Sequence, residues 1–267
     1  ILHLTNDYFG SMVYKNLFKN IGYNKFIQTV LIIIRTDQKK LISNSIINKY
    51  KLENSEIRIL FLNFFQSLFF RFFIFLRGIF LSGMIVRNNF LNSSSLVHAH
   101  TLFSNGSIAY ALSKKNNLKY IVAVRNVDVN YILKYYPWQR AYAKRILLNA
   151  KHIVFISPSL RNNLLNIINS ESISKKIKLK SSVIPNGIDK FWIDNAKKSN
   201  NKNFKRKINL IFVGEINPNK SIDLIIDSFI KIKSMYDKAS LKVVGSNKPG
   251  FHKSYTNNII NKCKSLK

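Results

Sequence analysis

Residues Leu96–Asn130 read LVHAHTLFSNGSIAYALSKKNNLKYIVAVRNVDVN. Two short apolar runs, Leu96–Ala99 and Lys119–Val124, have the length of buried strands. Between them, Asn105–Lys115 carries apolar residues at helical spacing. A strand, a helix and a second strand in this order are typical of a βαβ unit, whose two strands lie parallel in one sheet.

The same alternation of strand and helix patterns extends along the chain in both directions. The other expected strands are Ile1–Thr5, Gln28–Ile34, His152–Ile156, Ser182–Ile184, Ile208–Val213 and Leu241–Val244. The other expected helices are Met12–Ile21, Tyr131–Ala150, Pro158–Ile168 and Ser221–Met235. Ser157 is the expected N-cap of one of these helices, with Pro158 in its first turn. The pattern predicts an α/β protein built on parallel sheets.

A polar stretch divides the chain. Lys197–Lys207 (KKSNNKNFKRK) has the composition of a linker or an exposed loop, and a new strand–helix–strand pattern follows it. We therefore expect two Rossmann-like domains, residues 1–190 and residues 191–267, the second of them incomplete. The chain opens on an apolar run without a Met, so we interpret both of its ends as cut.

The composition narrows the class of protein. The 267 residues include 43 Lys+Arg and 12 Asp+Glu, a formal net charge of +31, and 46% are hydrophobic, which excludes a disordered chain. A single cysteine, Cys263, excludes a disulfide framework within the chain. The positive charge suits nucleic acid, an anionic membrane or a phosphorylated ligand, but a Lys-, Asn- and Ile-rich vocabulary is also typical of a genome-wide composition bias. Because the sequence has no recognisable groove-reading helix or RNA-binding strand, we do not expect a nucleic-acid partner.

The segment Ile57–Phe90 is unusually rich in Phe and Leu. Its longest run without a charged residue is Ile59–Phe70, 12 residues, which is short of the about 18 needed to cross a bilayer. Three interpretations stay open: a buried or partner-covered helix, a helix lying in the membrane interface, and a membrane span. In the second, Arg71 and Arg77 would face anionic head groups while the Phe and Leu side chains enter the acyl boundary.

Several segments taken together resemble the family 4 glycosyltransferases of the GT-B fold. They are Leu96–Asn130, VFISPSLRNNL (Val154–Leu164), VIPNGID (Val183–Asp189), LIFVGEINPNKSIDLIIDSF (Leu210–Phe229) and LKVVGSN (Leu241–Asn247), in the family's order and at similar spacing. The opening ILHLTNDYFGSMVYKNL extends the resemblance across the chain.

The resemblance implies an activity. It predicts an enzyme that moves a sugar, with retention, from a nucleotide-sugar donor held mainly by the second domain to an acceptor held mainly by the first. The implied acceptor is a glycan or is lipid-linked, in bacterial cell-surface polysaccharide or glycolipid synthesis, and the implied chemistry uses no metal or other cofactor. We expect the protein in the cytoplasm, peripheral on the inner face of the plasma membrane through Ile57–Phe90. The alternative is a truncated or degenerate relative that binds a phosphorylated or lipid-linked ligand without transfer.

The resemblance also assigns the residues that would bind the donor. Lys220 follows Gly214 and is expected to open the helix at Ser221, which places its ammonium beside a phosphate at a helix N-terminus. Gly10 lies in the first strand–helix loop, where the family brings backbone N–H groups near the donor phosphates. Glu215 stands where the family carries Arg and would oppose diphosphate binding. The family's acidic E-x7-E element has no match, so we do not expect a complete donor site in this chain.

Three further residues are candidates for the catalytic centre. His100 and Asp128 are expected at the carboxyl ends of two parallel strands, where open α/β sheets bind ligands. Arg125 replaces the histidine of the family and can hold a phosphate or carboxylate with two hydrogen bonds, while Asp128 could bind a sugar hydroxyl. The alternative for Arg125 and Asp128 is a buried structural pair. His98 is interpreted as a core histidine that faces the opposite side of the strand from His100.

The remaining expectations concern the hinge and metals. Asn186 and Gly187 form an NG pair that predicts a turn at the hinge between the two domains. The histidines lack the sequence spacing of metal ligands, and no nucleophile–base pair is visible, so neither a metalloenzyme nor a hydrolase is expected.

Overall fold

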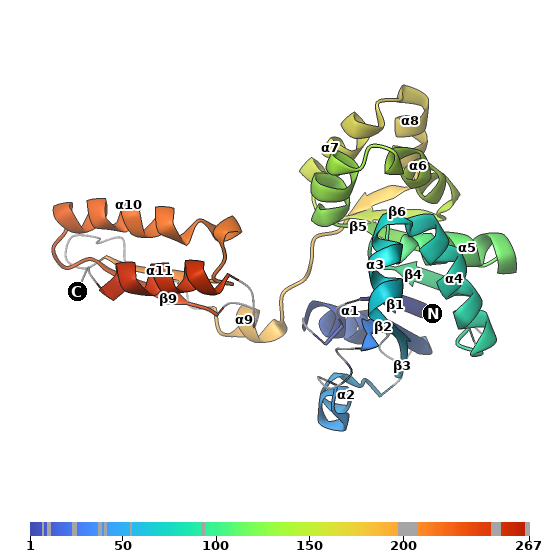
Figure 1. Ribbon diagram of the computed structural model, residues 1–267, viewed down its shortest axis with the longest axis horizontal. Coiled ribbons are helices and arrows are strands. Elements are labelled where there is room, and N and C mark those ends of the chain that lie inside the picture. Colours follow the sequence, from blue (N-terminus) through green and yellow to red (C-terminus); the bar gives the residue numbers. More distant parts are fainter. Residues whose placement is uncertain are drawn as a thin grey trace. The chain divides into compact units, whose positions relative to one another are not determined.

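The computed structural model describes residues 1–6, 8–9, 12–22, 26–36, 39, 42–53, 55–91, 94–196, 208–246 and 252–264. The chain forms two compact units, Ile1–Asn195 and Ala196–Lys267. The stretch Lys197–Lys207, expected as a linker, lies outside the described residues. Each unit is a separate α/β layer structure (Figure 1).

The first unit is built on a seven-stranded sheet in the order β3-β2-β1-β4-β5-β6-β7, and every neighbouring pair is parallel. The strands are β1 (Leu2–Thr5), β2 (Gln28–Arg35), β3 (Ser55–Leu62), β4 (Leu96–Ala99), β5 (Lys119–Val124), β6 (His152–Phe155) and β7 (Ser181–Val183). The predicted α/β class with a parallel sheet is confirmed. Strand order reverses between β1 and β4, which is the place where open parallel sheets bind their ligands.

Helices connect the strands of the first unit and cover both faces of its sheet. They are α1 (Met12–Gly22), α2 (Asn44–Tyr50), α3 (Phe64–Phe72), α4 (Ile74–Arg87), α5 (Gly106–Asn116), the π-helix η2 (Asp128–Leu133), α6 (Gln139–Asn149), α7 (Pro158–Ile168), α8 (Glu171–Leu179) and α9 (Lys190–Asp194). The Ser157 hydroxyl accepts a hydrogen bond from the Leu160 N–H at 3.2 Å, and Pro158 lies in the first turn of α7. The predicted cap and the predicted proline position are therefore confirmed.

The strand β2 shows why this sheet is a two-sided core. Leu31 and Ile33 pack into a large apolar cluster on one face, whereas Val30 and Ile32 pack with Phe18 and other side chains on the opposite face. Successive side chains of a strand point to opposite faces, so a strand buried on both sides reads as a continuous apolar run. The sequence of β2, QTVLIIIR, has this form.

The segment Ile57–Phe90 differs from the single helix that we expected. Its first residues belong to β3, which pairs with β2 over all eight of its residues. Asn63 then begins α3 with a capping box, because its side chain accepts the Gln66 N–H and the Gln66 side chain accepts the Asn63 N–H. The helix α4 follows after Phe73. Of the described helices, none combines the length and the apolar character that crossing a bilayer requires.

The expected helix Tyr131–Ala150 is also wrong, because it is two elements. The π-helix η2 ends at Leu133, and α6 begins only at Gln139. Pro137 lies between them, and a proline inside a helix removes a backbone hydrogen bond and clashes with the preceding turn.

The second unit pairs two parallel strands with two helices. β8 (Asn209–Val213) and β9 (Ser240–Val244) are in register over five residues, and α10 (Ile222–Met235) and α11 (Lys253–Lys264) pack with them through a small apolar cluster around Ile222 and Ile226. Gly245 allows the ends of β8 and β9 to meet, since a Cβ at this position would lie 1.8 Å from the Gly214 carbonyl oxygen.

Candidate functional site

The three expected catalytic residues follow the carboxyl ends of β4 and β5. His100 directly follows β4, and Arg125 directly follows β5. Asp128 begins η2 three residues later. Because parallel strands end at the same edge of a sheet, these residues meet where strand order reverses between β1 and β4.

Asp128 ties together the loops that follow β4 and β5. Its carboxylate is 3% exposed and accepts the N–H groups of Leu102 at 3.0 Å, Phe103 at 3.2 Å and Arg125 at 2.8 Å. Burial raises the pKa of Asp128 to about 6, although the three N–H groups favour the charged form. The carboxylate is therefore ionised at neutral pH, and both of its oxygens already bind the backbone.

Arg125 joins three separate parts of the first unit. Its Nε donates to the His100 carbonyl oxygen at 3.1 Å, and its Nη1 donates to Asn186 Oδ1 at 2.8 Å. The guanidinium also lies 6.0 Å from the ring centre of Tyr14 on α1. Arg125 and Asp128 are linked through the Arg125 backbone, so the structure brings together His100, Arg125, Asp128 and Asn186.

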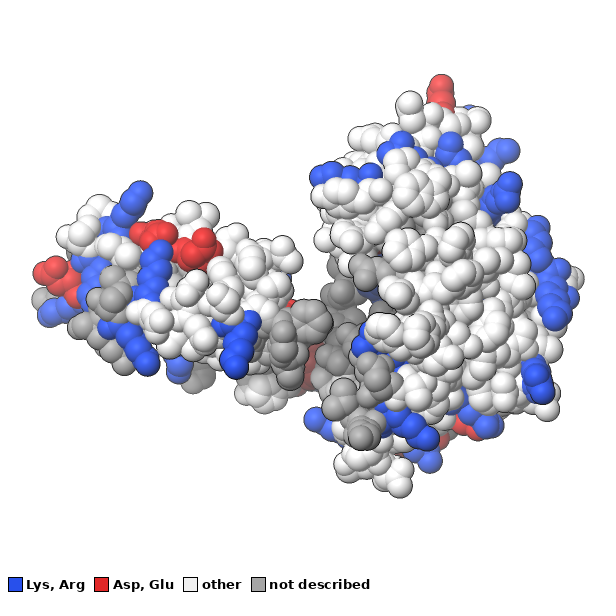
Figure 2. Space-filling model, viewed as in Figure 1, with Lys and Arg blue, Asp and Glu red and all other residues white. Residues whose placement is uncertain are grey.

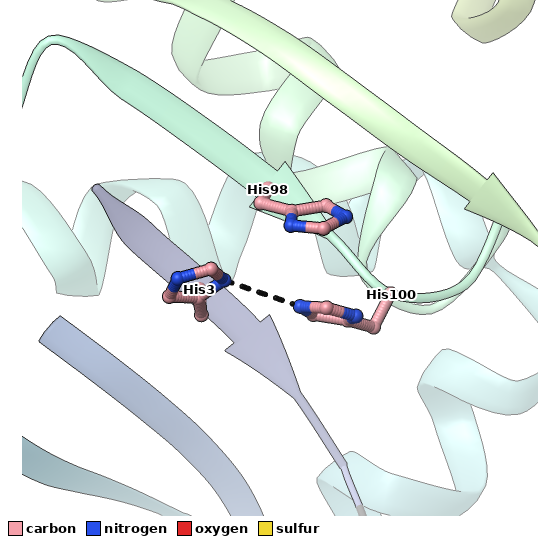
Figure 3. A group of neighbouring side chains, drawn as sticks. All are labelled: His3, His98 and His100. Carbon is pink, nitrogen blue, oxygen red and sulfur yellow. Dashed lines mark hydrogen bonds between the residues drawn. The ribbon is translucent and has the colours of Figure 1, made fainter. Parts of the chain in front are cut away.

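His3 on β1, His98 on β4 and His100 directly after β4 lie together on one face of the sheet (Figure 3). His3 Nδ1 and His100 Nε2 are 3.3 Å apart, and His3 Nε2 is 3.1 Å from Gln28 Oε1. Because the Gln28 amide nitrogen donates to the Phe18 carbonyl, its oxygen must accept from His3 Nε2. A neutral His3 then carries no proton on Nδ1, so His100 Nε2 is the donor in the bond between the two histidines. His100 Nδ1 therefore has no proton, and it is buried without a partner among the described residues.

The expectation that His98 and His100 face opposite sides is wrong. Residues two apart on a strand share a face, and the two rings are 4.0 Å apart. His98, expected in the core, is half-buried, whereas His100 is fully buried. His100 therefore acts on the site through its carbonyl oxygen, which holds Arg125.

The three imidazoles lie close enough together to be considered as metal ligands, which the spacing of the histidines in the sequence did not indicate. Nitrogens of His3, His98 and His100 lie within 4.8 Å of each other, a distance that could hold a metal ion. Desolvation lowers the pKa of each, to about 4 for His98, so all three are neutral at pH 7. The group contains no carboxylate, and the positive charge of Arg125 acts on His98 and His100, so the field there opposes a cation. We interpret it as a hydrogen-bonded network.

In the second unit, Lys220 lies in a short 3-10 turn, Pro218–Lys220, and is exposed. The helix α10 begins at Ile222, after Ser221 in the left-handed region with φ of 48°, so Lys220 precedes the helix rather than opening it. Gly214 directly follows β8, where its N–H donates to the Val244 carbonyl oxygen at 3.0 Å, and Glu215 beside it is half-buried.

Two backbone N–H groups at the N-terminus of α10 donate hydrogen bonds to a side chain of α11. The Tyr255 hydroxyl of α11 accepts the N–H groups of Ile222 at 3.1 Å and Asp223 at 3.4 Å, and it donates to Asp223 Oδ1 at 2.8 Å. Sequence reasoning missed both Tyr255 and Asp223. An acidic residue in the first turn of the expected helix was the available signal, because it stabilises the helix end without a ligand.

Two other expectations have different outcomes. Gly10 lies outside the described residues. The turn at Asn186–Gly187 is wrong, since residues 184–189 form no turn and neither Asn186 nor Gly187 has a positive φ. Asn186 is instead held by its bond to Arg125.

Solved structures share this fold. A glycosyltransferase from Rickettsia africae ESF-5 matches with a TM-score of 0.59 and 15% identity, covering 99% of this chain and 64% of its own. A structure described as trehalose-6-phosphate from E. coli bound with UDP-2-fluoro glucose matches with a TM-score of 0.62 and 12% identity, covering 99% and 68%. A putative UDP-N-acetylglucosamine 2-epimerase from Listeria monocytogenes matches with a TM-score of 0.53 and 11% identity, covering 97% and 65%.

The fold is that of the GT-B glycosyltransferases and related epimerases, and the chain spans about two thirds of the length of these structures. The family model for Glycosyltransferase Family 4 matches residues 51–190, just over half of the chain. The chain therefore belongs to glycosyltransferase family 4, as its motifs predicted. A comparison with curated proteins found no match.

Proposed function

We propose that the protein transfers a sugar from a nucleotide-sugar donor to an acceptor hydroxyl at the carboxyl edge of the first unit, with retention of configuration. The observation that carries this proposal is the arrangement of Arg125 at the reversal of strand order, held by His100 and Asn186. A fixed guanidinium at this edge can stabilise the negative charge that develops on a leaving diphosphate. Solved structures of this fold include proteins described as bound to UDP or a UDP-sugar.

The residues divide the work between positioning and binding. Asp128 fixes the two loops through backbone N–H groups, and His100 fixes Arg125 through its carbonyl oxygen, so both are positioning residues. Arg125 supplies positive charge at the edge of the first unit. In the second unit, the exposed Lys220 is the candidate cation for a donor phosphate. No metal or other cofactor is part of the proposal.

A binding experiment tests the donor site. We expect Lys220→Ala to weaken UDP binding to the full-length protein by about 1.5–3 kcal/mol, the usual worth of a hydrogen bond to a charged group. Lys233→Ala is the control, because Lys233 is exposed in the last turn of α10. Titration calorimetry that gives equal UDP affinity for wild type and the Lys220 variant would remove Lys220 from the donor site.

The acceptor side of the proposal rests on an apolar surface. The α3–α4 surface consists of ten large apolar side chains, each between 40% and 79% exposed: Phe64, Phe65, Leu68, Phe69, Phe72, Phe73, Phe75, Leu76, Ile79 and Phe80. A groove of about 550 Å³ between the two helices is lined by Phe65, Gln66, Phe69, Phe70, Leu76, Ile79 and Phe80. Neither helix contains Asp or Glu.

We propose that the α3–α4 surface docks on an anionic membrane. Contiguous apolar surface of this kind marks an interaction site, and helices of 9 and 14 residues are too short to span. Cations border it: Arg35 lies over the Phe64 ring, Lys39 over the Phe61 ring, and Arg87 is exposed at the end of α4. Figure 2 shows a broad face of the first unit without Lys or Arg and a margin where they gather.

Membrane docking fits the charge of the whole chain. With 43 Lys+Arg against 12 Asp+Glu, the protein is attracted to anionic lipid, and each cation near the surface contributes about 1 kcal/mol. We therefore propose a cytoplasmic protein, peripheral on the inner face of the plasma membrane, with a lipid-linked or glycan acceptor in bacterial polysaccharide or glycolipid synthesis. Arg77 is not part of the α3–α4 surface, because its Nη2 donates to Asn6 Oδ1. The side chain of Arg71 is not among those that the structure describes.

Vesicle flotation tests the docking. We expect the protein to float with phosphatidylglycerol-rich vesicles at low salt and to be released by high salt. The double variant Phe65→Ser and Phe69→Ser should remain in the soluble fraction, whereas the control Trp192→Ser, on exposed α9, should float like wild type. Absence of flotation at low salt, or resistance of wild type to both salt and alkaline carbonate, would contradict peripheral docking.

A second candidate function is binding of a phosphorylated or lipid-linked ligand without transfer. Two observations favour it: Glu215 lies beside the Gly214 backbone, and the N–H groups at the start of α10 are bonded to Tyr255 rather than free for a phosphate. The two functions differ in turnover. Ligand binding without consumption of any nucleotide sugar by the full-length protein would favour the second.

A further inference from the structure

Arg77 on α4 is a partly buried cation with no counter-ion among the described residues. Its side chain is half-buried, and its one hydrogen bond within the described residues runs from Nη2 to Asn6 Oδ1 at 3.4 Å. Its Nε is buried without a partner, and no described carboxylate lies within ion-pair distance. Burial lowers the pKa of Arg77 to about 10, so the guanidinium is charged at neutral pH.

A close helix contact holds Arg77 at the site edge of the sheet. A Cβ on the neighbouring Gly78 would lie 2.5 Å from the Ser107 carbonyl oxygen, so α4 meets the first turn of α5 backbone to backbone. Asn6, the partner of Arg77, directly follows β1, and α5 follows β4. Arg77 therefore lies where strand order reverses, the place where ligands bind in open α/β sheets.

The loop between β4 and α5 is linked to Arg77 through Asn6. The Asn6 amide nitrogen donates to Ser104 Oγ at 2.5 Å, and Ser104 Oγ lies 2.7 Å from Thr101 Oγ1. In the same loop, Asn105 is fully buried, and neither its Nδ2 nor its Oδ1 has a partner among the described residues. Among the described residues, α4 thus carries a guanidinium and the loop an amide with buried polar atoms that have no partner.

A ligand with negative charge would complete these groups. A guanidinium taken out of water without a counter-ion loses hydration and gains nothing in return. The planar fork of an arginine matches the oxygens of a phosphate, with which it forms short charge-assisted bonds. Because Thr101 and Ser104 share one hydrogen bond between their hydroxyls, one hydroxyl proton of this pair remains to donate to a ligand oxygen.

We propose that Arg77, oriented by Asn6 and Ser104, binds a phosphate group at the carboxyl edge of β1 and β4. This inference deepens the proposed function and rests on it for the origin of the phosphate, which belongs either to a phosphorylated acceptor or to the donor diphosphate. Both sources share the chemistry of a tetrahedral oxyanion. The binding itself is a property of the first unit.

Inorganic phosphate is the probe that tests the site. We expect the wild-type chain to bind phosphate in calorimetry and Arg77→Gln to bind it at least tenfold more weakly. Arg87→Gln is the matched control, since Arg87 is an exposed arginine on the same helix, and it should stay within twofold of wild type. Equal affinity of wild type and the Arg77 variant, or no saturable binding by wild type, would overturn the proposal.

A second variant guards against a folding defect. Asn6→Asp would supply Arg77 with a counter-ion from the chain itself, at the position where Asn6 Oδ1 now lies 3.4 Å from Nη2. We expect this variant to melt at a higher temperature than wild type and to lose phosphate binding. A variant that keeps wild-type phosphate affinity would contradict the site even if it is well folded.

Competition with UDP identifies the source of the phosphate. If UDP displaces inorganic phosphate in a manner that depends on Arg77, the site belongs to the donor; if both bind together, it belongs to the acceptor. Phosphate binding is measured without any transfer, so the two proposals fail separately. Transfer without Arg77-dependent phosphate binding would overturn only the phosphate site, and the opposite result would overturn only the transfer.

Discussion

The buried histidine network predicts that the first unit loses stability in mild acid. His3, His98 and His100 are held neutral because burial lowers their pKa, to about 4 for His98. The native state therefore binds fewer protons than the unfolded chain, in which histidine titrates near 6.5. Their contribution to stability is complete above pH 6.5 and is lost as the pH falls from 6.5 toward the lowered values.

The expected size follows from proton linkage. Each histidine that stays neutral costs about 1.4 kcal/mol of stability per pH unit below 6.5, or about 2 kcal/mol at pH 5. Three histidines give about 6 kcal/mol at most, which is comparable to the whole stability of an ordinary domain. The raised pKa of Asp128 offsets part of this loss, because that carboxyl takes up a proton more readily in the folded state. We therefore expect the first unit to be measurably less stable at pH 5 than at pH 7.

Denaturant titrations at a series of pH values between 7 and 5 measure this loss. His98→Phe should reduce the loss by about 2 kcal/mol, because it removes one titrating group and no side-chain hydrogen bond shown in the structure. The control Leu4→Val, at a buried non-titrating position on β1, should lower stability equally at every pH. If wild type and His98→Phe show the same pH dependence, the network does not titrate as argued.

Three further substitutions probe the packing and the loops of the site, with thermal unfolding as the readout. Gly78→Ala should destabilise the first unit by about 1–3 kcal/mol, because its Cβ would lie 2.5 Å from the Ser107 carbonyl oxygen. The control Gly83→Ala on the same helix has open space around its Cβ and should be neutral or stabilise the unit by up to about 1 kcal/mol. The reverse order of the two stabilities would refute the close contact at Gly78. Asp128→Asn should destabilise by about 2–4 kcal/mol, since an amide nitrogen would face backbone N–H donors, and an unchanged melting temperature would contradict the clamp. Gly245→Ala should unfold the second unit at a lower temperature, because its Cβ would lie 1.8 Å from the Gly214 oxygen, and equal melting of that unit would show that β8 and β9 separate freely.

The sequence predicted a strand correctly where a short apolar run had polar residues on both sides. Strands β4 and β5 have the predicted bounds, because each is a short apolar run bounded by polar residues. Strand β3 was hidden inside a long apolar segment, where a strand and a helix cannot be told apart by composition alone. Its pairing with β2 decides the outcome, and that pairing is a tertiary contact.

The site was predictable in its location more than in its roles. Parallel strand ends placed His100, Arg125 and Asp128 together, as expected from the fold. The use of the Asp128 carboxylate by three N–H groups, and of Arg125 by Asn186, depends on loop conformations that no local pattern encodes. In one of the three interpretations of Ile57–Phe90, Arg77 faced lipid head groups, whereas in the structure it is bonded to Asn6 at the sheet edge, beside the close contact at Gly78.

The stereochemistry of sugar transfer tests the central claim most directly. The full-length protein would be incubated with UDP-, GDP- and ADP-sugars and a bacterial lipid extract on anionic vesicles, and the product's anomeric proton would be observed by NMR. The account predicts that one donor is consumed only when the acceptor is present, and that the product keeps the donor's anomeric configuration. An inverted product, or no consumption of any nucleotide sugar, would contradict it.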